Sequence, residues 1–425
     1  MERLVNKRIL LGVTGSIAAY KAAEVVRRLR DAGADVRVVL TRGASEFVTA
    51  MTFQALSGHA VHQELLDTEA EAGMGHIELA RWADTILVAP ASADFLARLA
   101  QGRADDLLSA ICLASDVPLA MAPAMNTHMW QNPATQQNVR TLAARGVVML
   151  GPDAGEQACG EIGLGRMQAP EVLLAGLADL FQTGVLSGKT VMVTAGPTCE
   201  AIDAVRFLSN HSSGKMGFSV AEAAVEAGAR VILVAGPVAL TTPGQWQRLD
   251  VVSAPELFGT VLAHSQGVEL FIAPSAVAGA RPGGVATGKT KKKAEHIQLE
   301  LEPTPDILSE VKVRFPRLFC VGFAAETEAL DEYAQDKLQR KGVEMIAANW
   351  VGPAAAEAEG AFGSDTNALR LFWKDGSAEL PVASKSKLAR QLILQIAQLE
   401  EAWGERVIED DKVVTLPESG RRTRR

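Results

Sequence analysis

Two widely separated segments of the chain have residue types and spacing that suit phosphate binding. Gly12–Ser16 follows a short apolar run, and Ser212–Gly217 precedes a helical pattern. Glycine lets the backbone approach a ligand closely, serine supplies a hydroxyl group, and the N–H groups at a helix N-terminus attract an anion. Each segment leads through a helix and an Ala-Gly-Ala return to another apolar run, the pattern of a βαβ unit. We therefore expect two phosphate-binding domains, and two activities, in one chain.

The first of these turns also fits a plain helix-capping turn. It lacks the third glycine of a dinucleotide-binding fingerprint, and no acidic residue follows the second predicted strand, where Thr41–Gly43 stand. An acid at that place normally binds the ribose of NAD. Its absence argues against NAD and favours a monophosphate ligand such as FMN.

Three further side chains are candidates for binding or proton transfer. Ser92 follows the predicted strand 85–89, at the edge where doubly wound sheets bind ligands, although it also fits a helix N-cap. His76 is a candidate general base, because histidine titrates near neutral pH, but an isolated histidine is more often a surface or cap residue. Asn126, after another predicted strand, suits binding of a carboxylate; the alternative is a turn with core contacts.

The four cysteines differ in their surroundings. Cys112 and Cys320 lie in apolar runs typical of packed cores, whereas Cys159 lies in the glycine-rich stretch 151–165. A thiol on a mobile flap suits proton donation inside a closed site. The absence of a CxxC pair argues against a disulfide framework or a zinc site and favours a reduced, cytoplasmic protein.

The composition indicates a globular protein of more than one domain. The chain has 425 residues, of which 48% are hydrophobic, and a net charge of −8. That charge argues against non-specific nucleic-acid binding. No apolar run approaches the roughly 18 residues of a membrane span, and the start of the chain has no signal-peptide pattern.

Short apolar runs alternate with helical patterns in both halves, which predicts two doubly wound, Rossmann-like α/β domains with parallel sheets. The first domain, 1–181, has predicted strands at 9–13, 36–40, 85–89, 119–122 and 147–150, and predicted helices near 18–31, 44–57, 74–82, 92–99, 105–114, 134–144 and 170–181. A linker is expected at 182–189. The second domain, 190–402, has a predicted strand from Thr190, strands at 231–235, 270–273, 319–323 and 345–348, a hairpin-like pair at 368–373 and 378–380, and a closing helix at 384–402. Residues 403–425 are expected to form a disordered polar tail.

The motifs of the first half, taken together and in order, resemble those of the flavin-dependent cysteine decarboxylases. The resemblance is specific to the phosphopantothenoylcysteine decarboxylase half of bacterial bifunctional coenzyme A biosynthesis enzymes, and it implies a flavodoxin-like flavoprotein domain. It implies that His76 serves the oxidative step and closes the site, that Asn126 holds the substrate carboxylate, and that Cys159 donates the final proton. The positions implied for FMN are Gly15, Ser16, Ile17, Thr41, Ala91 and Ser92.

The second half contains the rare string Ser209–Gly217, which resembles the phosphopantothenate–cysteine ligase signature. The resemblance implies that Asn210 serves an acyl-cytidylate intermediate and that Lys289 serves its attack by cysteine, with Mg²⁺ accompanying CTP and metal ligands that the sequence does not identify. The positions implied for CTP are Ser212, Ser213, Gly214, Ala273, Ser275, Lys289, Pro305, Asp306, Ile307, Leu308, Phe323, Lys337 and Lys341. Without the resemblance, Lys337 and Lys341 read as surface lysines and 288–293 as a solvated basic loop.

The resemblance, which covers roughly residues 5–400, implies one bifunctional enzyme of coenzyme A biosynthesis. It would ligate 4′-phosphopantothenate to cysteine with CTP and then decarboxylate 4′-phosphopantothenoylcysteine with FMN. It also implies a homo-oligomer, a dodecamer built from decarboxylase trimers and ligase dimers, with small-molecule substrates and neither nucleic acid nor membrane as a partner.

Three positions depart from the family pattern in the ligase half. Cys199 stands where the family has arginine, Gly279 where it has an acidic residue, and Thr304 where it has asparagine. These departures leave open an active decarboxylase joined to a weak or purely structural dimerisation domain. A flavin-binding subunit without turnover is a third reading, against which His76, Asn126 and Cys159 argue together.

Overall fold

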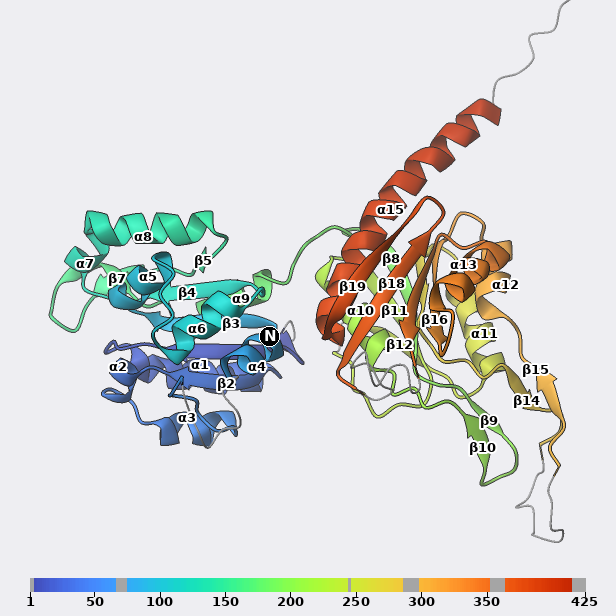
Figure 1. The fold of residues 1–425 in the computed structure, drawn as a ribbon, viewed down its shortest axis with the longest axis horizontal. Helices are drawn as coiled ribbons and strands as arrows, with labels where there is room; N and C mark the ends of the chain where they lie inside the picture. Colours follow the sequence, from blue (N-terminus) through green and yellow to red (C-terminus); the bar gives the residue numbers. More distant parts are fainter. Residues whose placement is uncertain (1–3, 66–74, 244–245, 286–297, 352–363, 415–425) are drawn as a thin grey trace, which may run out of the picture. The chain divides into compact units, whose positions relative to one another are not determined.

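A computed structural model describes residues 4–65, 75–243, 246–285, 298–351 and 364–414 of the protein. The chain forms two compact units, Met1–Gln182 and Thr183–Arg425, and each is described by itself (Figure 1). Each unit contains one large sheet with apolar cores on both of its faces. This arrangement confirms the two doubly wound α/β folds that the sequence predicts.

The large sheet of the first unit has five parallel strands in the order β2-β1-β3-β4-β5. Their bounds are Arg8–Val13 (β1), Asp35–Leu40 (β2), Thr85–Ala91 (β3), Leu119–Pro123 (β4) and Val148–Met149 (β5). β1 pairs in parallel with both β2 and β3. The strand order therefore reverses at β1, with β2 added on one side of it and β3 on the other. Doubly wound sheets bind ligands at the carboxyl ends of the strands beside such a reversal.

Side chains alternate between the two faces of this sheet. Ile9 and Leu11 of β1 belong to one core and Leu10 to the other, because successive strand residues point to opposite sides. The first core is covered by α1 (Ala19–Asp31), α3 (Ala50–Ser57) and α9 (Pro170–Asp179), and the second by α4 (Gly75–Trp82), α5 (Ala93–Ala100), α6 (Leu107–Ala114) and α8 (Pro133–Ala144). Two short helices, α2 (Arg42–Ser45) and α7 (Thr127–Gln131), follow the ends of β2 and β4.

The glycine-rich stretch forms an antiparallel hairpin of β6 (Asp153–Glu156) and β7 (Ile162–Arg166). Gly165 accepts a hydrogen bond from the backbone N–H of Met125 at 2.9 Å. A side chain at Gly165 would collide with the Met125 carbonyl, and one at Gly163 would collide with Thr127. The glycines therefore let the hairpin pack directly on the loop after β4.

The large sheet of the second unit has the strand order β12-β11-β8-β13-β16-β17-β18-β19. The first six strands are parallel, and the last two form an antiparallel extension. The bounds are Thr190–Ala195 (β8), Arg230–Ala235 (β11), Gln247–Asp250 (β12), Leu270–Ala273 (β13), Phe319–Glu326 (β16), Met345–Trp350 (β17), Thr366–Trp373 (β18) and Gly376–Ser384 (β19). One face is covered by α10 (Lys215–Glu226) and α15 (Lys385–Val414), and the other by α11 (Ala254–His264), α12 (Ile307–Arg314) and α13 (Leu330–Lys341).

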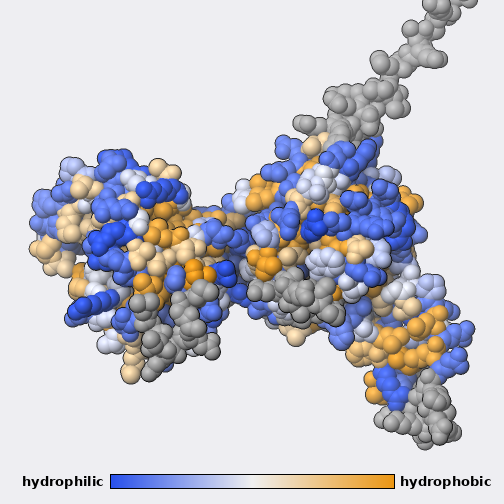
Figure 2. All heavy atoms as spheres, in the orientation of Figure 1, coloured by the Kyte–Doolittle hydropathy of each residue, from blue (hydrophilic) through white to orange (hydrophobic). Residues whose placement is uncertain are grey.

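Two small hairpins project from this unit and lie side by side (Figure 1). They are formed by β9 (Cys199–Ala201) with β10 (Phe207–Ser209), and by β14 (Ala280–Pro282) with β15 (Leu301–Pro303). Apolar side chains gather on them, as Figure 2 shows, with Phe207 59% and Leu301 49% exposed. Neither the β9–β10 hairpin nor the β14–β15 hairpin was predicted from the sequence.

Three predicted boundaries are wrong. The helix expected at 44–57 is broken into α2 and α3, since Thr49 has an extended backbone with ψ 152°. The closing helix, expected to end at 402, continues to Val414, because Trp403 still packs on the sheet, with its ring centroid 5.8 Å from that of Phe319. The segment expected to be a linker packs on the second unit, where Leu186 is fully buried. Residues 415–425 of the expected tail lie outside the described residues.

Within the described residues, no helix has both the length and the apolar character that crossing a membrane requires.

The ion pair between Arg390 of α15 and Glu226 of α10 gives a test of the second unit. Arg390 donates two hydrogen bonds to Glu226, at 2.8 and 3.1 Å, and the Glu226 side chain is 7% exposed. A buried carboxylate that loses its cation is strongly destabilising. We expect Arg390→Met to lower the free energy of unfolding of this unit by about 3 kcal/mol, measured from the urea transition of the unit.

The matched control for this substitution is Arg340→Met. Arg340 pairs with Asp336 at 3.6 Å, and both side chains are largely exposed. Exposed pairs contribute less than about 1 kcal/mol. Equal effects of the two substitutions would contradict a structural role for the buried pair.

Candidate functional site

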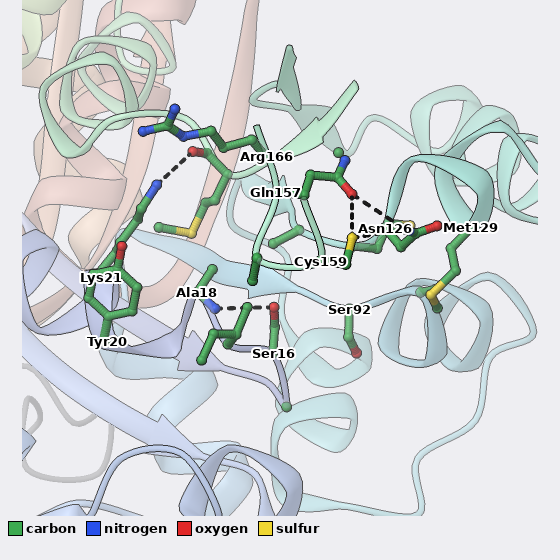
Figure 3. Close-up of a pocket in the computed structure, with 18 of the residues that line it drawn as sticks. Ser16, Ala18, Tyr20, Lys21, Ser92, Asn126, Met129, Gln157, Cys159 and Arg166 are labelled. Atoms are coloured by element: carbon green, nitrogen blue, oxygen red, sulfur yellow. Dashed lines mark hydrogen bonds between the residues drawn. The ribbon is translucent and has the colours of Figure 1, made fainter. Parts of the chain in front are cut away.

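A cavity of about 660 Å³ lies in the first unit, at the carboxyl ends of β1, β3 and β4 and against the β6–β7 hairpin (Figure 3). Six of the residues predicted to form the first site line it together, and they are Gly15, Ser16, Ile17, Ser92, Asn126 and Cys159. A second cavity of about 910 Å³ adjoins it and shares Gly15 and Ser92 with it. Thr41 lines the second cavity.

The turn after β1 is built for close backbone approach. A Cβ on Gly15 would lie 3.0 Å from the Gly43 carbonyl carbon, so glycine lets the turns after β1 and β2 touch. Ser16 accepts a hydrogen bond from the N–H of Ala18 at 3.3 Å. Ala18, the N-cap of α1, makes no side-chain capping bond, and the first turn of α1 carries no acidic residue. This helix N-terminus therefore offers N–H groups and no negative charge to an anion.

The strand ends are tied to one another by short hydrogen bonds. The Thr14 hydroxyl donates to the Pro90 carbonyl at 2.7 Å and accepts from the N–H of Ser92 at 2.9 Å. Ser92 also caps α5 by accepting from the N–H of Phe95 at 3.2 Å, so it is an N-cap as well as a cavity residue. Ala91 is fully buried and holds the loop after β4 through its carbonyl, which accepts from Ala124 at 3.0 Å. The side chain of Ala91 therefore serves the packing, and neither cavity is lined by it.

The thiol and the amide come together from different elements. Asn126 caps α7, and its Nδ2 lies 3.5 Å from Sγ of Cys159, which stands in the turn between β6 and β7. Gln157 joins them: its Oε1 accepts from the N–H of Thr127 at 3.0 Å and lies 4.0 Å from the thiol. The amide of Asn126 also donates to the carboxylate of Glu161. Glu161 thus shows that this amide can bind a carboxylate.

His76 is not brought into this cluster within one chain. It lies in the first turn of α4, and the lining of neither cavity includes it. Its Nδ1 is buried and has no hydrogen-bond partner among the residues that the structure describes. The geometry of a single chain therefore assigns no task to His76.

Sequence reasoning missed three side chains that line the first cavity, Gln157, Lys21 and Arg166, and also Glu161, which binds the amide of Asn126. Gln157 and Glu161 lie within the glycine-rich stretch that singled out Cys159, and Arg166 directly follows it. Lys21 lies one helical turn beyond the N-cap of α1, so the spacing from Ser16 could have found it. Lys21 and Arg166 meet at this cavity from segments far apart in the chain, which no local pattern reports.

A smaller cavity of about 330 Å³ lies at the ends of β13 and β16 in the second unit. The predicted CTP residues that line it are Ala273, Ser275, Pro305, Asp306, Ile307, Leu308, Phe323, Lys337 and Lys341. Ser275 accepts a hydrogen bond from the Thr194 hydroxyl at 2.8 Å, which anchors the loop after β13 to β8.

The two lysines of this cavity differ in their surroundings. Lys337 donates to the carbonyl of Phe323 at 2.6 Å, and burial together with neighbouring Lys341 lowers the pKa of Lys337. Lys341 pairs with Asp306, the N-cap of α12. Burial raises the pKa of Asp306, but hydrogen bonds from Lys341 and Ser309 outweigh it, and the net pKa lies below the ordinary 3.8. Two lysines therefore face this cavity, and within the described ranges Lys341 is the one that pairs with a carboxylate.

The signature turn lies beside this cavity. Gly214 has a left-handed backbone, with φ 78°, and caps α10, and the Ser212 hydroxyl accepts from its N–H at 3.4 Å. Asn210 donates to the carbonyl of Ala276 at 2.8 Å, next to Ser275 of the lining. Ser212, Ser213, Gly214 and Asn210 are not among the residues that line the cavity. Lys289 lies outside the described residues.

The structure places the three residues that depart from the family pattern. Gly279 lines the cavity, and a Cβ on it would meet nothing within 4 Å, so an acidic side chain has room there but is missing. Thr304 donates to the carbonyl of Ala278. Cys199 lies on β9, 3.5 Å from the Ser209 hydroxyl. No group of three metal-ligating side chains occurs in the described part of the chain.

Titration of Asp306 tests the electrostatics of the smaller cavity. Because its pKa is lowered in the folded chain, its interactions stabilise the fold above the unfolded pKa and are lost as pH falls through the folded value. We expect Lys341→Met to raise the Asp306 pKa, measured by carbon NMR of its carboxyl group. Arg314 is an exposed cation on α12, and Arg314→Met should leave the Asp306 pKa unchanged. An unchanged Asp306 pKa in Lys341→Met would contradict the pairing.

Two protein families match the chain, one to each unit. Residues 1–182 match the family described as Flavoprotein, and residues 186–399 match the DNA/pantothenate metabolism flavoprotein C-terminal domain. The Coenzyme A biosynthesis bifunctional protein CoaBC of Haemophilus influenzae is 52% identical over 398 residues, which are 93% of this chain and 98% of that protein. The protein of the same name from Bacillus subtilis is 43% identical and covers 95% of this chain and all of its own length.

Among solved structures, the C-terminal domain of a Coenzyme A biosynthesis bifunctional protein CoaBC is similar. It is 40% identical, covers 52% of this chain and 100% of that domain, and has a TM-score of 0.44. The full-length relatives and the two family matches confirm the resemblance found in each half of the sequence. The chain therefore belongs to the family of bifunctional coenzyme A biosynthesis proteins.

Proposed function

We propose that the first unit decarboxylates 4′-phosphopantothenoylcysteine with FMN and that the second ligates 4′-phosphopantothenate to cysteine with CTP. The observation that carries the proposal is the meeting of Cys159, Asn126 and the phosphate-binding turn at one cavity. Family membership supports the same pair of activities. The four cysteines are free thiols, which supports a cytoplasmic location.

The residues of the first unit fit a flavin mononucleotide. The N-terminus of α1, with Gly15 and Ser16, suits the phosphate, and Thr41 and Ser92 line the two adjoining cavities. Ile17 and Met129 provide apolar surface for a ring system. When bound, the flavin supplies a two-electron oxidation of the substrate thiol and the later return of a hydride.

Asn126 and Cys159 supply the remaining groups. The Asn126 amide donates a hydrogen bond to the carboxylate of the cysteine moiety and so orients the bond that breaks when CO2 leaves. Glu161 accepts a hydrogen bond from this amide in the present structure, so the substrate carboxylate must displace Glu161. The bond's electrons move toward the thiocarbonyl that thiol oxidation creates, since an amide-linked cysteine has no other electron sink. Cys159 then donates a proton to the carbon that has lost its carboxylate. The hairpin turn that carries the thiol closes over the substrate.

His76 enters the proposal through assembly. The family resemblance implies trimers of the first unit and dimers of the second, and cyclic assembly brings surfaces of different copies together. We assign His76 to the cavity of a neighbouring copy, since its Nδ1 is buried and has no hydrogen-bond partner among the described residues of its own chain.

The second unit supplies fixed charge for two successive displacements. A carboxylate oxygen of phosphopantothenate attacks the α-phosphorus of CTP and pyrophosphate leaves; the amine of cysteine then attacks the acyl carbon and CMP leaves. Both steps place negative charge on oxygen, which cations such as Lys337 and Lys341 stabilise. Asn210 and Lys289 are assigned to the acyl-cytidylate, and Mg²⁺ accompanies the triphosphate.

The alternative is an active decarboxylase with a weak or purely structural second unit. Gly279 favours it, because the cavity wall lacks the carboxylate for which it has room. Pyrophosphate release distinguishes the two.

Replacing the thiol tests the decarboxylase. We expect Cys159→Ser to lower the rate of 4′-phosphopantetheine formation by about 100-fold or more, because general acid–base groups contribute 10²–10⁴-fold. Mass spectrometry of the product measures that rate, and the flavin content should not change. Cys199→Ser, which alters a thiol in the other unit, is the control and should keep the full rate. A full rate in Cys159→Ser would refute the proton donor.

Pyrophosphate release tests the ligase. The protein should release pyrophosphate when given phosphopantothenate, cysteine, CTP and Mg²⁺. Asn210→Ala should slow release by about 100-fold, the loss typical of one stabilising donor. Asn138→Ala, on α8 of the first unit, should change nothing. No release at high concentrations of the unaltered protein would favour the structural module.

A further inference from the structure

Lys21 and Arg166 are two cations on the wall of the 660 Å³ cavity to which the proposed chemistry gives no task. Lys21 belongs to α1, and Arg166 is the last residue of β7. The fold therefore brings them to one cavity from segments far apart in the chain. Figure 3 shows them on the opposite side of the cavity from Cys159 and Asn126.

Neither cation is neutralised by the described residues. Lys21 donates one long hydrogen bond, 3.4 Å, to the carbonyl of Met167, and it forms no ion pair. Burial and the nearby Arg166 lower the pKa of Lys21, so the fold holds two like charges close together. Asp153 is the acidic residue whose charge raises the pKa of Lys21, and it already accepts a hydrogen bond from Gln168 at 3.1 Å. Like charges that converge on a cavity without a counter-charge repel each other until an anion joins them.

The substrate of the proposed decarboxylation has an anion at the required end. It carries the reacting cysteine at one terminus and a phosphate monoester at the other, with the pantothenoyl chain between them. Guanidinium binds phosphate oxygens through two parallel hydrogen bonds, and ammonium adds a point charge. The proposed function assigns the flavin phosphate to the N-terminus of α1, whereas Figure 3 shows Lys21 reaching away from Ser16 toward Arg166.

We propose that Lys21 and Arg166 form the subsite for the 4′-phosphate of the substrate and so select phosphorylated over unphosphorylated pantothenoylcysteine. This inference rests on the proposed decarboxylase function. It assigns the cavity two ends: a reacting end at Asn126 and Cys159, and a selecting end at Lys21 and Arg166.

The test compares two substrates on three full-length variants. Decarboxylation of 4′-phosphopantothenoylcysteine and of pantothenoylcysteine is measured with the unaltered protein, Lys21→Met, Arg166→Met and the control Arg140→Met, which removes an exposed cation from α8. We expect each cavity variant to lose about 10- to 100-fold in kcat/KM for the phosphorylated substrate, the worth of a charge-assisted hydrogen bond, mostly through KM. The rate with pantothenoylcysteine, the flavin content and all values for Arg140→Met should be unchanged.

Each other outcome overturns the proposal in a distinct way. Equal losses with both substrates would show that the two cations serve the shared part of the substrate or the fold. Loss of flavin from the variants would assign them to the flavin phosphate. Unaltered protein that turns over both substrates equally well would refute the subsite and leave the decarboxylase standing, whereas one that turns over neither would refute both.

Discussion

Parallel pairing of β1 with β2 and β3, and of β3 with β4, decides where the loops of the first site lie. Because the carboxyl ends of these strands share one edge, four separate loops meet there. Hydrogen bonds between the strand ends, such as those of Thr14 with Pro90 and Ser92, hold the loops in place. The edge of the sheet therefore brings together the loops that follow its strands, and the β6–β7 turn completes the site.

The glycine hairpin adds a further element to this edge. Gly163 and Gly165 let β7 lie against the loop after β4, and the turn between β6 and β7 carries Cys159 to Asn126. Glu161 in the same turn binds the amide that we assign to the substrate carboxylate. One short segment therefore brings both the proposed proton donor and a group that the substrate displaces, so binding of substrate and positioning of the thiol are linked.

The sequence was informative wherever a local pattern has one physical cause. Alternating apolar runs and helices predicted both sheets, and glycine with serine at a strand end predicted the turn at Gly15 and Ser16. It was uninformative where long-range packing decides. The ordered β6–β7 hairpin depends on contacts with Met125, and the extension of α15 depends on the contact of Trp403 with Phe319. Lys21 and Arg166 line one cavity although they lie far apart in the sequence. His76 is the opposite case, because its residue type suggested a catalyst but its position on α4 does not bring it to either cavity within one chain.

The central claim is that the carboxyl edge of the first sheet holds FMN beside Cys159. The most direct measurement is the flavin content of the purified full-length protein, by absorbance and by chromatography of the flavin released on denaturation. We predict a yellow protein that releases about one FMN per chain and no FAD, as expected of one monophosphate turn in each first unit. A colourless protein that no flavin restores, yet still forms the decarboxylated product, would contradict the account.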